Sequence, residues 1–380
     1  MKWAWAKIDH GLSRRIKSLK SLLGLPRKIW RLPGCRRIQR ASFARENYGE
    51  RGALVIFLFP GMQRVTGGGL QIFSLHRLTR KFLRATDGDS VICWLPGTNW
   101  SDHRFEGFDN DVTIFPLEMV LRLCREDCEL LIHLPEFAAE SFCHKFGWTR
   151  IAFLRKRHKL KISILEQNNE VMPNPLFLKN LRNIVPDLNA TVGSSAWMTR
   201  SERQRLGIPL HLLPTWYYPD DAPWQPWESK EDLLIVSPDA SPCRDMVINA
   251  IRRARPELRI QIIWGLKYED YLKLERAAKW SLTFGEGLDG YFYGPMLRGG
   301  ISFAVRNGTF DIPGLEERRT IYDSYEDMAA RIVNDMRALD DKSAYETYTK
   351  SVRIALESEF GSERTANALH AFYRGNLTMP

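Results

Sequence analysis

The residues best suited to chemistry lie in a glycine-rich segment from Trp280 to Pro295. It reads Trp-Ser-Leu-Thr-Phe-Gly-Glu-Gly-Leu-Asp-Gly-Tyr-Phe-Tyr-Gly-Pro, so an apolar run ends in a loop where two carboxylates, Glu286 and Asp289, stand among glycines. Glycine lets a backbone approach a ligand closely, and a carboxylate accepts hydrogen bonds from hydroxyl groups. We therefore expect a strand that ends in a ligand-binding loop, followed by a short helix that opens at Pro295–Arg298.

A second glycine-rich turn, Gly67–Gly69, joins the first apolar strand to a helix that we expect from about Leu70 to Leu83. The start of a helix carries a partial positive charge and free backbone N–H groups, which together favour an anionic ligand. The turn lacks the Lys and Ser/Thr of a P-loop. A flexible turn without a ligand therefore stays open as the alternative.

The segment 280–305 resembles the donor-binding segment of retaining GT-B glycosyltransferases, which read Glu-Gly-Phe-Gly-x-Pro, a helix, and then Gly before a strand. Here Gly299 and Gly300 precede the apolar run Ile301–Val305. The segment is most similar to bacterial cell-surface polysaccharide glycosyltransferases of the group 1 or family 4 type, for capsule, O-antigen or exopolysaccharide. Their loop reads like Phe-Gly-Glu-Gly-x-Asp-Gly-Tyr-Phe. The turn Gly67–Gly69 also resembles the family's first loop, and the strand–helix order matches from about Ala53 onward.

The resemblance implies roles for the glycine-rich segments. Glu286 matches the carboxylate that lies against the donor sugar and is the implied catalytic residue. The relatives hold the ribose hydroxyls with a second Glu eight residues later, where this chain has Gly294. Because that side chain is missing, we expect Asp289 to replace it. The implied donor-binding set is Gly68, Gly69, Ser237, Arg244, Lys267, Gly287, Asp289, Gly290, Tyr291 and Gly294.

Two of these residues are implied phosphate ligands. The relatives supply a Lys or Arg near the first strand of the second half, where this chain has Ser237 through Arg244. The guanidinium fork of Arg244 suits phosphate oxygens, and Lys267, after the next strand, is a second candidate. An ordinary solvated cation at a helix start is the alternative for both.

Polar residues follow two predicted strands of the first half. His133 and Glu136 come at the end of the first, in the position where relatives often carry a His that faces the cleft. The run Glu-Gln-Asn-Asn-Glu at 166–170 follows the second strand and could bind acceptor sugars. We expect His133 to act on the donor sugar or the acceptor hydroxyl, and Glu136, Gln167 and Asn168 to bind the acceptor. A structural histidine and an ordinary turn are the alternatives.

No metal site is expected. Asp109-Asn110-Asp111 has the Asp-x-Asp pattern that binds a metal and a diphosphate in the other major transferase fold, but there the motif follows a strand and here it precedes one. Phosphate charge would then be met by Arg, Lys and helix N-termini. The six cysteines form no pair of CxxC units, which argues against structural zinc.

The candidate site residues lie between strands and helices that alternate along the sequence. Such alternation is the pattern of a parallel sheet covered on both faces. In the first half we expect strands at Ala53–Phe59, Ser90–Leu95, Val112–Phe115, Glu129–Leu134, Lys161–Leu165, Ala190–Gly193 and His211–Leu213, and a helix at Leu117–Cys124. In the second half we expect strands at Asp232–Val236, Arg259–Trp264, Trp280–Phe284 and Ile301–Val305. The helices there are expected at Met246–Ala254 and Tyr268–Ala278, with two or three more within 325–373.

A connector rich in Pro, Trp and Tyr separates the halves. The expected units are a basic arm at 1–48, an acceptor domain at 49–215, a linker at 216–231, and a donor domain with terminal helices at 232–380. Together they make a GT-B fold, in which two Rossmann-like domains face each other across a cleft. Ligands of open α/β sheets bind beyond the carboxyl ends of the strands.

The positive charge is concentrated at the start of the chain. Of the 380 residues, 55 are Lys or Arg and 45 are Asp or Glu, but residues 1–45 hold 13 Lys/Arg and one acid, Asp9. Apolar residues recur there at helical spacing from Trp5 to Leu23, as in a helix that lies in a membrane interface. We expect this arm to bind an anionic membrane, with an ordinary docking helix as the alternative. No apolar run of about 18 residues exists to span a bilayer.

The expected function is transfer of a sugar from a nucleoside diphosphate sugar to a glycan or lipid-linked saccharide. The expected location is the cytoplasmic face of the cell membrane, with reduced thiols and no cofactor. A catalytically silent GT-B scaffold in a polysaccharide assembly complex is the alternative. Binding of nucleic acid ranks last, because the rest of the chain carries no basic excess.

Overall fold

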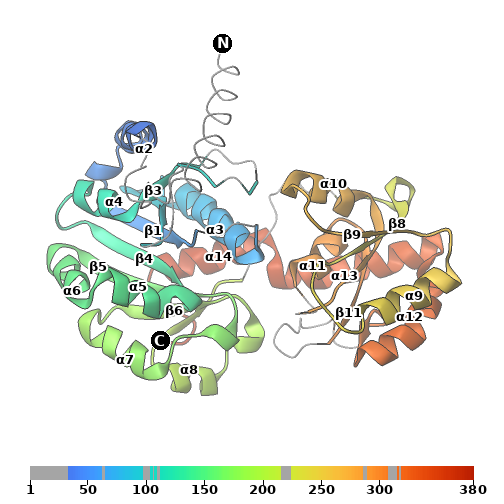
Figure 1. Cartoon of the computed structure of the whole chain (residues 1–380). Helices are drawn as coiled ribbons and strands as arrows, with labels where there is room; N and C mark the ends of the chain where they lie inside the picture. Colours follow the sequence, from blue (N-terminus) through green and yellow to red (C-terminus); the bar gives the residue numbers. More distant parts are fainter. Residues whose placement is uncertain are drawn as a thin grey trace, which may run out of the picture.

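The chain folds into two α/β units, seen in a computed structural model (Figure 1). The structure describes residues 33–61, 65–96, 103–105, 107–108, 112–214, 224–285, 289–306, 315 and 318–380. Each unit has a sheet in which every strand pair is parallel, and helices cover both faces. The predicted architecture of two parallel-sheet domains is confirmed.

The first sheet has the order β3-β2-β1-β4-β5-β6-β7. Its interior strand β1 is buried from Leu54 to Phe59, as expected for a strand with helices on both sides. Its strands are β1 (Ala53–Phe59), β2 (Gly88–Trp94), β3 (Ile114–Pro116), β4 (Glu129–Pro135), β5 (Lys159–Glu166), β6 (Leu188–Val192) and β7 (Leu210–Leu212). The helices of this unit are α2 (Pro33–Arg45), α3 (Gly67–Leu83), α4 (Leu117–Leu123), α5 (Ala139–Phe146), α6 (Trp148–Arg157), α7 (Pro175–Ile184) and α8 (Arg200–Leu206).

The second sheet has the order β12-β11-β10-β8-β9. Its strands are β8 (Glu231–Val236), β9 (Arg259–Ile262), β10 (Ala278–Leu282), β11 (Ile301–Val305) and β12 (Ile321–Tyr322). The helices that follow in the chain are α9 (Arg244–Ala254), α10 (Tyr268–Ala277), α11 (Gly290–Leu297), α12 (Tyr325–Leu339), α13 (Lys342–Phe360) and α14 (Ser362–Tyr373).

Helix α11 begins five residues before the helix predicted at Pro295–Arg298, so that prediction is wrong about the start. Asp289 caps the helix, and its side chain accepts a hydrogen bond from the backbone N–H of Tyr291 at 2.9 Å. Pro295 then lies inside the helix, where its missing N–H leaves the carbonyl of Tyr291 without its helical donor. Ser281 Oγ donates to that carbonyl at 3.2 Å, which explains how the proline is accommodated.

The last helix returns to the first unit. The sequence grouped residues 232–380 together, but α14 packs on the first sheet, where Leu369 and Phe372 share an apolar cluster with Phe57. Beyond it, Met379 forms an antiparallel bridge with Leu210. Figure 1 shows α13 in the second unit and α14 crossing over to the first. Within the described residues, the chain therefore returns to the first unit at Gly361, between α13 and α14.

Part of the predicted basic arm belongs to the folded body. Residues 1–32, with the expected membrane helix, lie outside the described residues. Helix α2, however, packs on the first unit through Phe43, which is 3 % exposed and contacts the rings of Tyr48 and Phe115. Gln39 donates its amide to the carbonyl of Ile114 at 2.8 Å. The arm as defined from the sequence thus extends too far, because α2 carries both basic and core residues.

Candidate functional site

The first glycine-rich turn is held by a residue from a distant loop. Thr66 caps α3 by accepting a hydrogen bond from Gly69 N at 3.1 Å. Gln167 donates its amide to the carbonyl of Gly68 at 3.0 Å. A Cβ atom on Gly68 would lie 2.2 Å from Gln167 Oε1, so a side chain at this position would displace the amide. The close approach of the Gln167 side chain therefore favours glycine at position 68.

The same loop is tied to the end of β4. Asn168 donates its backbone N–H to Glu136 Oε1 at 3.1 Å. Glu136 is 3 % exposed, and burial raises the pKa of its carboxyl to about 7. Its other oxygen, Oε2, has no hydrogen-bond partner in the described part of the chain. The structure thus brings together three residues predicted to bind the acceptor, Glu136, Gln167 and Asn168, beside Gly68 at the carboxyl edge of the first sheet.

Two further carboxylates lie behind this cluster. Glu166, at the end of β5, is fully buried, and burial with the neighbouring Glu202 and Glu136 raises its pKa to about 8. With its amide nitrogen turned toward them, Asn169 donates to Glu166 at 3.2 Å and to Glu202 at 2.8 Å. Arg205 also pairs with Glu202. The sequence pointed to the polar run 166–170 but not to Glu202, which joins it only through the fold.

His133 lies in a different place from the one expected. It is 1 % exposed, stacks on Phe57 at 4.6 Å between ring centroids, and is covered by Phe372 of α14. Burial lowers its pKa to about 3, so the ring is neutral at physiological pH. Its Nε2 lies 3.4 Å from the hydroxyl of Tyr373. In this conformation the imidazole packs beneath α14 and presents no open face to a ligand.

The second half of the site lies at the carboxyl edge of the second sheet. Arg244 is the first residue of α9, and its guanidinium lies 5.7 Å from the ring centroid of Phe284, just beyond β10. Its Nε and Nη2 atoms are inaccessible and have no hydrogen-bond partner among the described residues. Such unpaired buried donors are uncommon in folded proteins. A helix start and an unsatisfied cation thus coincide where an anionic ligand would satisfy both.

The loops around Arg244 are fixed by close contacts. Buried Ser237 accepts a hydrogen bond from Phe284 N at 3.0 Å, so this predicted donor-binding side chain joins β8 to the loop after β10. Gly285 has a φ of +73°, a conformation that favours glycine. A Cβ atom there would lie 3.0 Å from Cβ of Asp239. Asp239, which the sequence did not single out, therefore lies against the glycine-rich loop.

The other predicted donor-binding residues are spread along this edge. Glu286 and Gly287 lie outside the described residues, as do the three residues 109–111 of the rejected metal motif. Gly290 and Tyr291 form the first turn of α11, and Gly294 is buried in the second turn. Lys267 is the exposed residue that precedes α10.

An aromatic chain connects the two units. Phe73 of α3 contacts Phe108 at 4.9 Å between ring centroids, and Phe108 contacts Tyr268 of α10 at 5.9 Å. Tyr268 touches Tyr271 at 6.2 Å, which in turn touches Tyr291 at 5.7 Å. Phe108 follows β2 and Tyr268 follows β9, so the carboxyl edges of the two sheets meet at one junction. These ring contacts were not predicted from the sequence. The signal that could have indicated them is a pair of aromatic residues, Phe105 and Phe108, in a polar loop.

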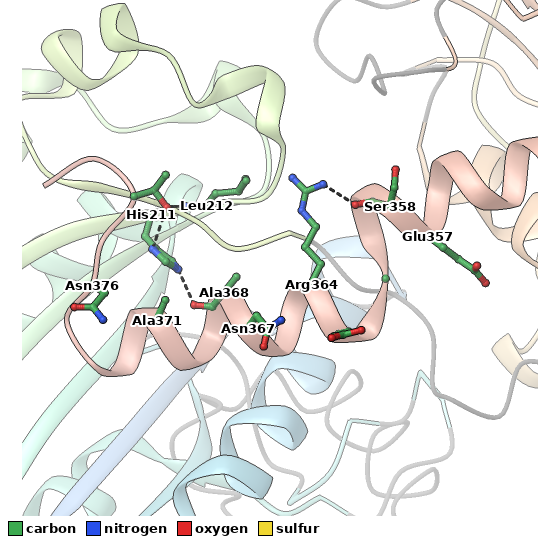
Figure 2. Close-up of a pocket in the computed structure, with 12 residues that line it drawn as sticks. His211, Leu212, Glu357, Ser358, Arg364, Asn367, Ala368, Ala371 and Asn376 are labelled. Carbon is green, nitrogen blue, oxygen red and sulfur yellow. Dashed lines mark hydrogen bonds between the residues drawn. The ribbon is translucent and has the colours of Figure 1, made fainter.

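A separate pocket of about 600 Å³ lies between the end of β7 and the junction of α13 with α14 (Figure 2). His211, Arg364, Asn367 and Asn376 are among its lining residues. His211 is held by the carbonyl of Ala368 at 2.8 Å. No predicted site residue lines this pocket, and Arg364 already bonds to Glu359 and to the carbonyl of Ser358. The pocket therefore marks the place where α14 packs on the first unit and is not one of the predicted ligand sites.

Comparison with known proteins identifies the fold. No family model matches the chain, and no curated protein is a significant match in sequence. Among solved structures, Anabaena HepE in complex with UDP and glucose is similar, with a TM-score of 0.55 and 10% identity over 85% of this chain and 100% of that one. Trehalose-6-phosphate synthase OtsA has a TM-score of 0.53 and 9% identity over 85% and 98%. An alpha-glucosyltransferase in complex with UDP and DNA has 0.52 and 9% over 84% and 99%. The two sheets therefore form a GT-B fold.

Proposed function

We propose that this chain is a glycosyltransferase that moves a sugar from a nucleoside diphosphate sugar to a glycan or lipid-linked saccharide in cell-surface polysaccharide synthesis. The observation that carries the proposal is the pair of inaccessible nitrogen atoms of Arg244, Nε and Nη2, which have no hydrogen-bond partner among the described residues and lie at the start of α9 beside a glycine-rich loop. Two phosphate groups of a donor would supply the missing acceptors. Solved GT-B structures with UDP or UDP-glucose make a uridine nucleotide the first donor to test.

In this proposal the second unit binds the donor. Arg244 and the N-terminus of α9 meet the diphosphate, Lys267 adds charge at the edge, and Asp289 accepts from the ribose in place of a Glu at Gly294. Glu286 lies against the donor sugar. Because the phosphates are met by cations and backbone N–H groups, we propose that transfer needs no metal and no other cofactor.

The first unit binds the acceptor. Gln167 holds the donor-binding turn at Gly68 and Gly69 and forms one wall, and Glu136 and Asn168 offer hydrogen-bonding groups to sugar hydroxyls. The reaction breaks the bond from the anomeric carbon to the diphosphate and forms one to the acceptor oxygen. Charge develops on the departing phosphate, which takes up the proton that the acceptor hydroxyl loses. Arg244 stabilises that charge, and the resemblance of the loop at 280–305 supports retention of the anomeric configuration.

We propose a cytoplasmic location at the inner face of the cell membrane, with residues 1–32 as an attachment to anionic lipid. Within the described part of the chain, no helix combines the length and apolar character needed to cross a bilayer. Gly294 favours one alternative, a catalytically silent scaffold, because a helix-buried glycine offers no side chain to a ribose. Turnover separates the two.

The test is a screen of nucleoside diphosphate sugars for a rise in the thermal unfolding midpoint, followed by a transfer assay with the donor that binds. Glu286→Gln should keep the fold and lower kcat by about a hundredfold or more, while Arg244→Gln should weaken donor binding by at least about tenfold. If no nucleotide sugar raises the midpoint of the wild-type chain, the transferase proposal is wrong. Binding without turnover would favour the scaffold.

A further inference from the structure

Two neighbouring helices of the first unit carry only positive charge. Helices α6 and α7 contain no Asp or Glu, and they pack together through the rings of Trp148 and Phe177 at 5.7 Å. Their six basic residues are Arg150, Arg155, Lys156, Arg157, Lys179 and Arg182. The chain after residue 45 has no excess of basic residues, so this charge is segregated.

Most of these cations have no acidic partner. Arg157 pairs with Glu126, and Arg182 donates to the carbonyl of Gly207. The four exposed residues Arg150, Arg155, Lys156 and Lys179 have no ion pair with any described residue. On α13, by contrast, Lys350 pairs with Glu346 and Arg353 with Glu357. The α6–α7 face, defined by Arg150, Phe153, Lys156, Leu176 and Lys179, is therefore a positively charged surface.

Each of the two helices also exposes a large apolar side chain. Phe153 is 60% exposed and Leu176 is 65% exposed. Phe153 has Arg150 three residues before it and Lys156 three residues after it, a spacing that places all three on one side of the helix. Leu176 has the same spacing to Lys179. Large exposed apolar side chains next to cations that have no ion pair among the described residues are the composition of a surface that binds a partner.

We infer that the α6–α7 face docks on an anionic lipid bilayer. Helices that lie in a membrane interface combine protruding aromatic and aliphatic side chains with Lys and Arg, and anionic headgroups attract such cations. Nucleic acid would use the cations but would leave Leu176 without a partner, which favours lipid. The inference concerns a surface apart from residues 1–45 and goes beyond the proposed transfer reaction, on which it does not depend.

The first experiment measures binding of the full-length chain to vesicles by co-sedimentation. Vesicles of phosphatidylglycerol and phosphatidylcholine are compared with phosphatidylcholine alone. The variant Arg150→Gln, Phe153→Ser, Lys156→Gln should bind the anionic vesicles at least about tenfold more weakly than wild type. All three side chains are exposed, so the thermal midpoint should stay close to wild type.

The matched control is Lys350→Gln, Arg353→Gln, Ile354→Ser on α13. It removes the same charge and a 70% exposed apolar residue from a face whose cations are ion-paired. The control should bind vesicles like wild type. Equal weakening by both variants would show that only net charge matters, and would overturn the inference.

A second measurement needs no substitution. Lysines of the wild-type chain are acetylated with and without anionic vesicles, and the modified sites are identified by mass spectrometry. In the presence of anionic vesicles, Lys156 and Lys179 should lose at least about half of their reactivity toward the acetylating reagent, while the reactivity of Lys350 should not change. Unchanged reactivity at Lys156 and Lys179 would overturn the inference. So would protection of both lysines by duplex DNA at equal charge, because the face would then serve nucleic acid.

Discussion

At the scale of single residues, the site depends on groups that the fold leaves partly unsatisfied. Within the part of the chain that the structure describes, Arg244 has no hydrogen-bond partner for two inaccessible nitrogen atoms, and Glu136 has none for Oε2. Unmet hydrogen-bonding capacity in a buried position is costly unless a ligand or water completes it. The two residues lie in different units, so they mark separate parts of the proposed site: one for a phosphate group and one for a hydroxyl-rich acceptor.

Asp289 has a structural role that must be separated from ribose binding. Asp289→Ala removes the cap of α11 and should lower the free energy of unfolding by about 1 kcal/mol, as well as weakening nucleoside diphosphate binding about tenfold. Asp289→Ser keeps a capping oxygen, so it should restore stability and leave binding weak. Urea unfolding and calorimetric titration measure the two effects. If Asp289→Ser recovered both stability and nucleotide binding, Asp289 would act only as a helix cap. The same would follow if Asp289→Ala weakened binding of a 2′,3′-dideoxy nucleotide equally, because that ligand has no ribose hydroxyls.

The raised pKa values of Glu136 and Glu166 give the free energy of unfolding a pH dependence. Both groups bind a proton more tightly in the folded state, with pKa values of about 7 and about 8 against a usual 4.5. Their contribution is therefore complete below about pH 4.5 and is lost as the pH rises through the folded values. Between about pH 5 and pH 8, Glu166→Gln should flatten this decline, which is on the order of 1 kcal/mol per pH unit. Urea unfolding across that pH range measures how the free energy of unfolding changes with pH. If Glu166→Gln left this slope unchanged, Glu166 would not be the group that binds the proton.

At the scale of elements, the sequence predicted each strand of both sheets except β12, because apolar runs between turn signals are distinctive in parallel sheets. The limits of α11 were not predictable in the same way. Pro295 marks a helix start by local preference, and only the contact of Ser281 with the carbonyl of Tyr291 shows why it sits inside. His133 was misplaced for a similar reason, since α14 covers it from more than 200 residues away. Contacts between distant segments decide such cases, and single-sequence patterns do not contain them.

Helix α2 decides where the basic arm can be cut. Removing residues 1–32 should leave the thermal midpoint close to that of the full chain, because the contacts of α2 with the body remain. Removing residues 1–45 also deletes Phe43 and the bond from Gln39 to Ile114, and should cost about 3–5 kcal/mol, as for loss of a buried aromatic side chain. Denaturant unfolding of the two truncations tests this. Equal stability would mean that α2 only rests on the surface.

At the scale of the whole molecule, the returning helix α14 and the aromatic chain at the junction of the sheets both join the two units, as far as the described residues show. The first fixes the C-terminal end of the chain to the first sheet through Leu369, Phe372 and Met379. The second reaches from α3, whose start carries Gly68, to Tyr291 beside the donor loop. The proposed donor and acceptor residues are thus placed relative to each other by contacts that neither unit makes alone.

Phe108 and Tyr268 form the one step of the aromatic chain that crosses between units, so their contact should matter for transfer and little for binding of a nucleotide by itself. We expect Phe108→Ala and Tyr268→Ala each to lower kcat/KM about tenfold, because the two halves of the site lose their relative placement. Tyr268→Phe keeps the ring and should stay near wild type.

Since Phe108→Ala and Tyr268→Ala remove the same contact, the double variant should be little worse than either single one, with a coupling energy of about 0.5–1.5 kcal/mol. The kinetic measurement is paired with a titration of the nucleoside diphosphate, whose Kd should change less than twofold or so. Additive losses in the double variant, or an equal loss of nucleotide affinity, would show that the two rings act within their own units and that α14 alone sets the arrangement.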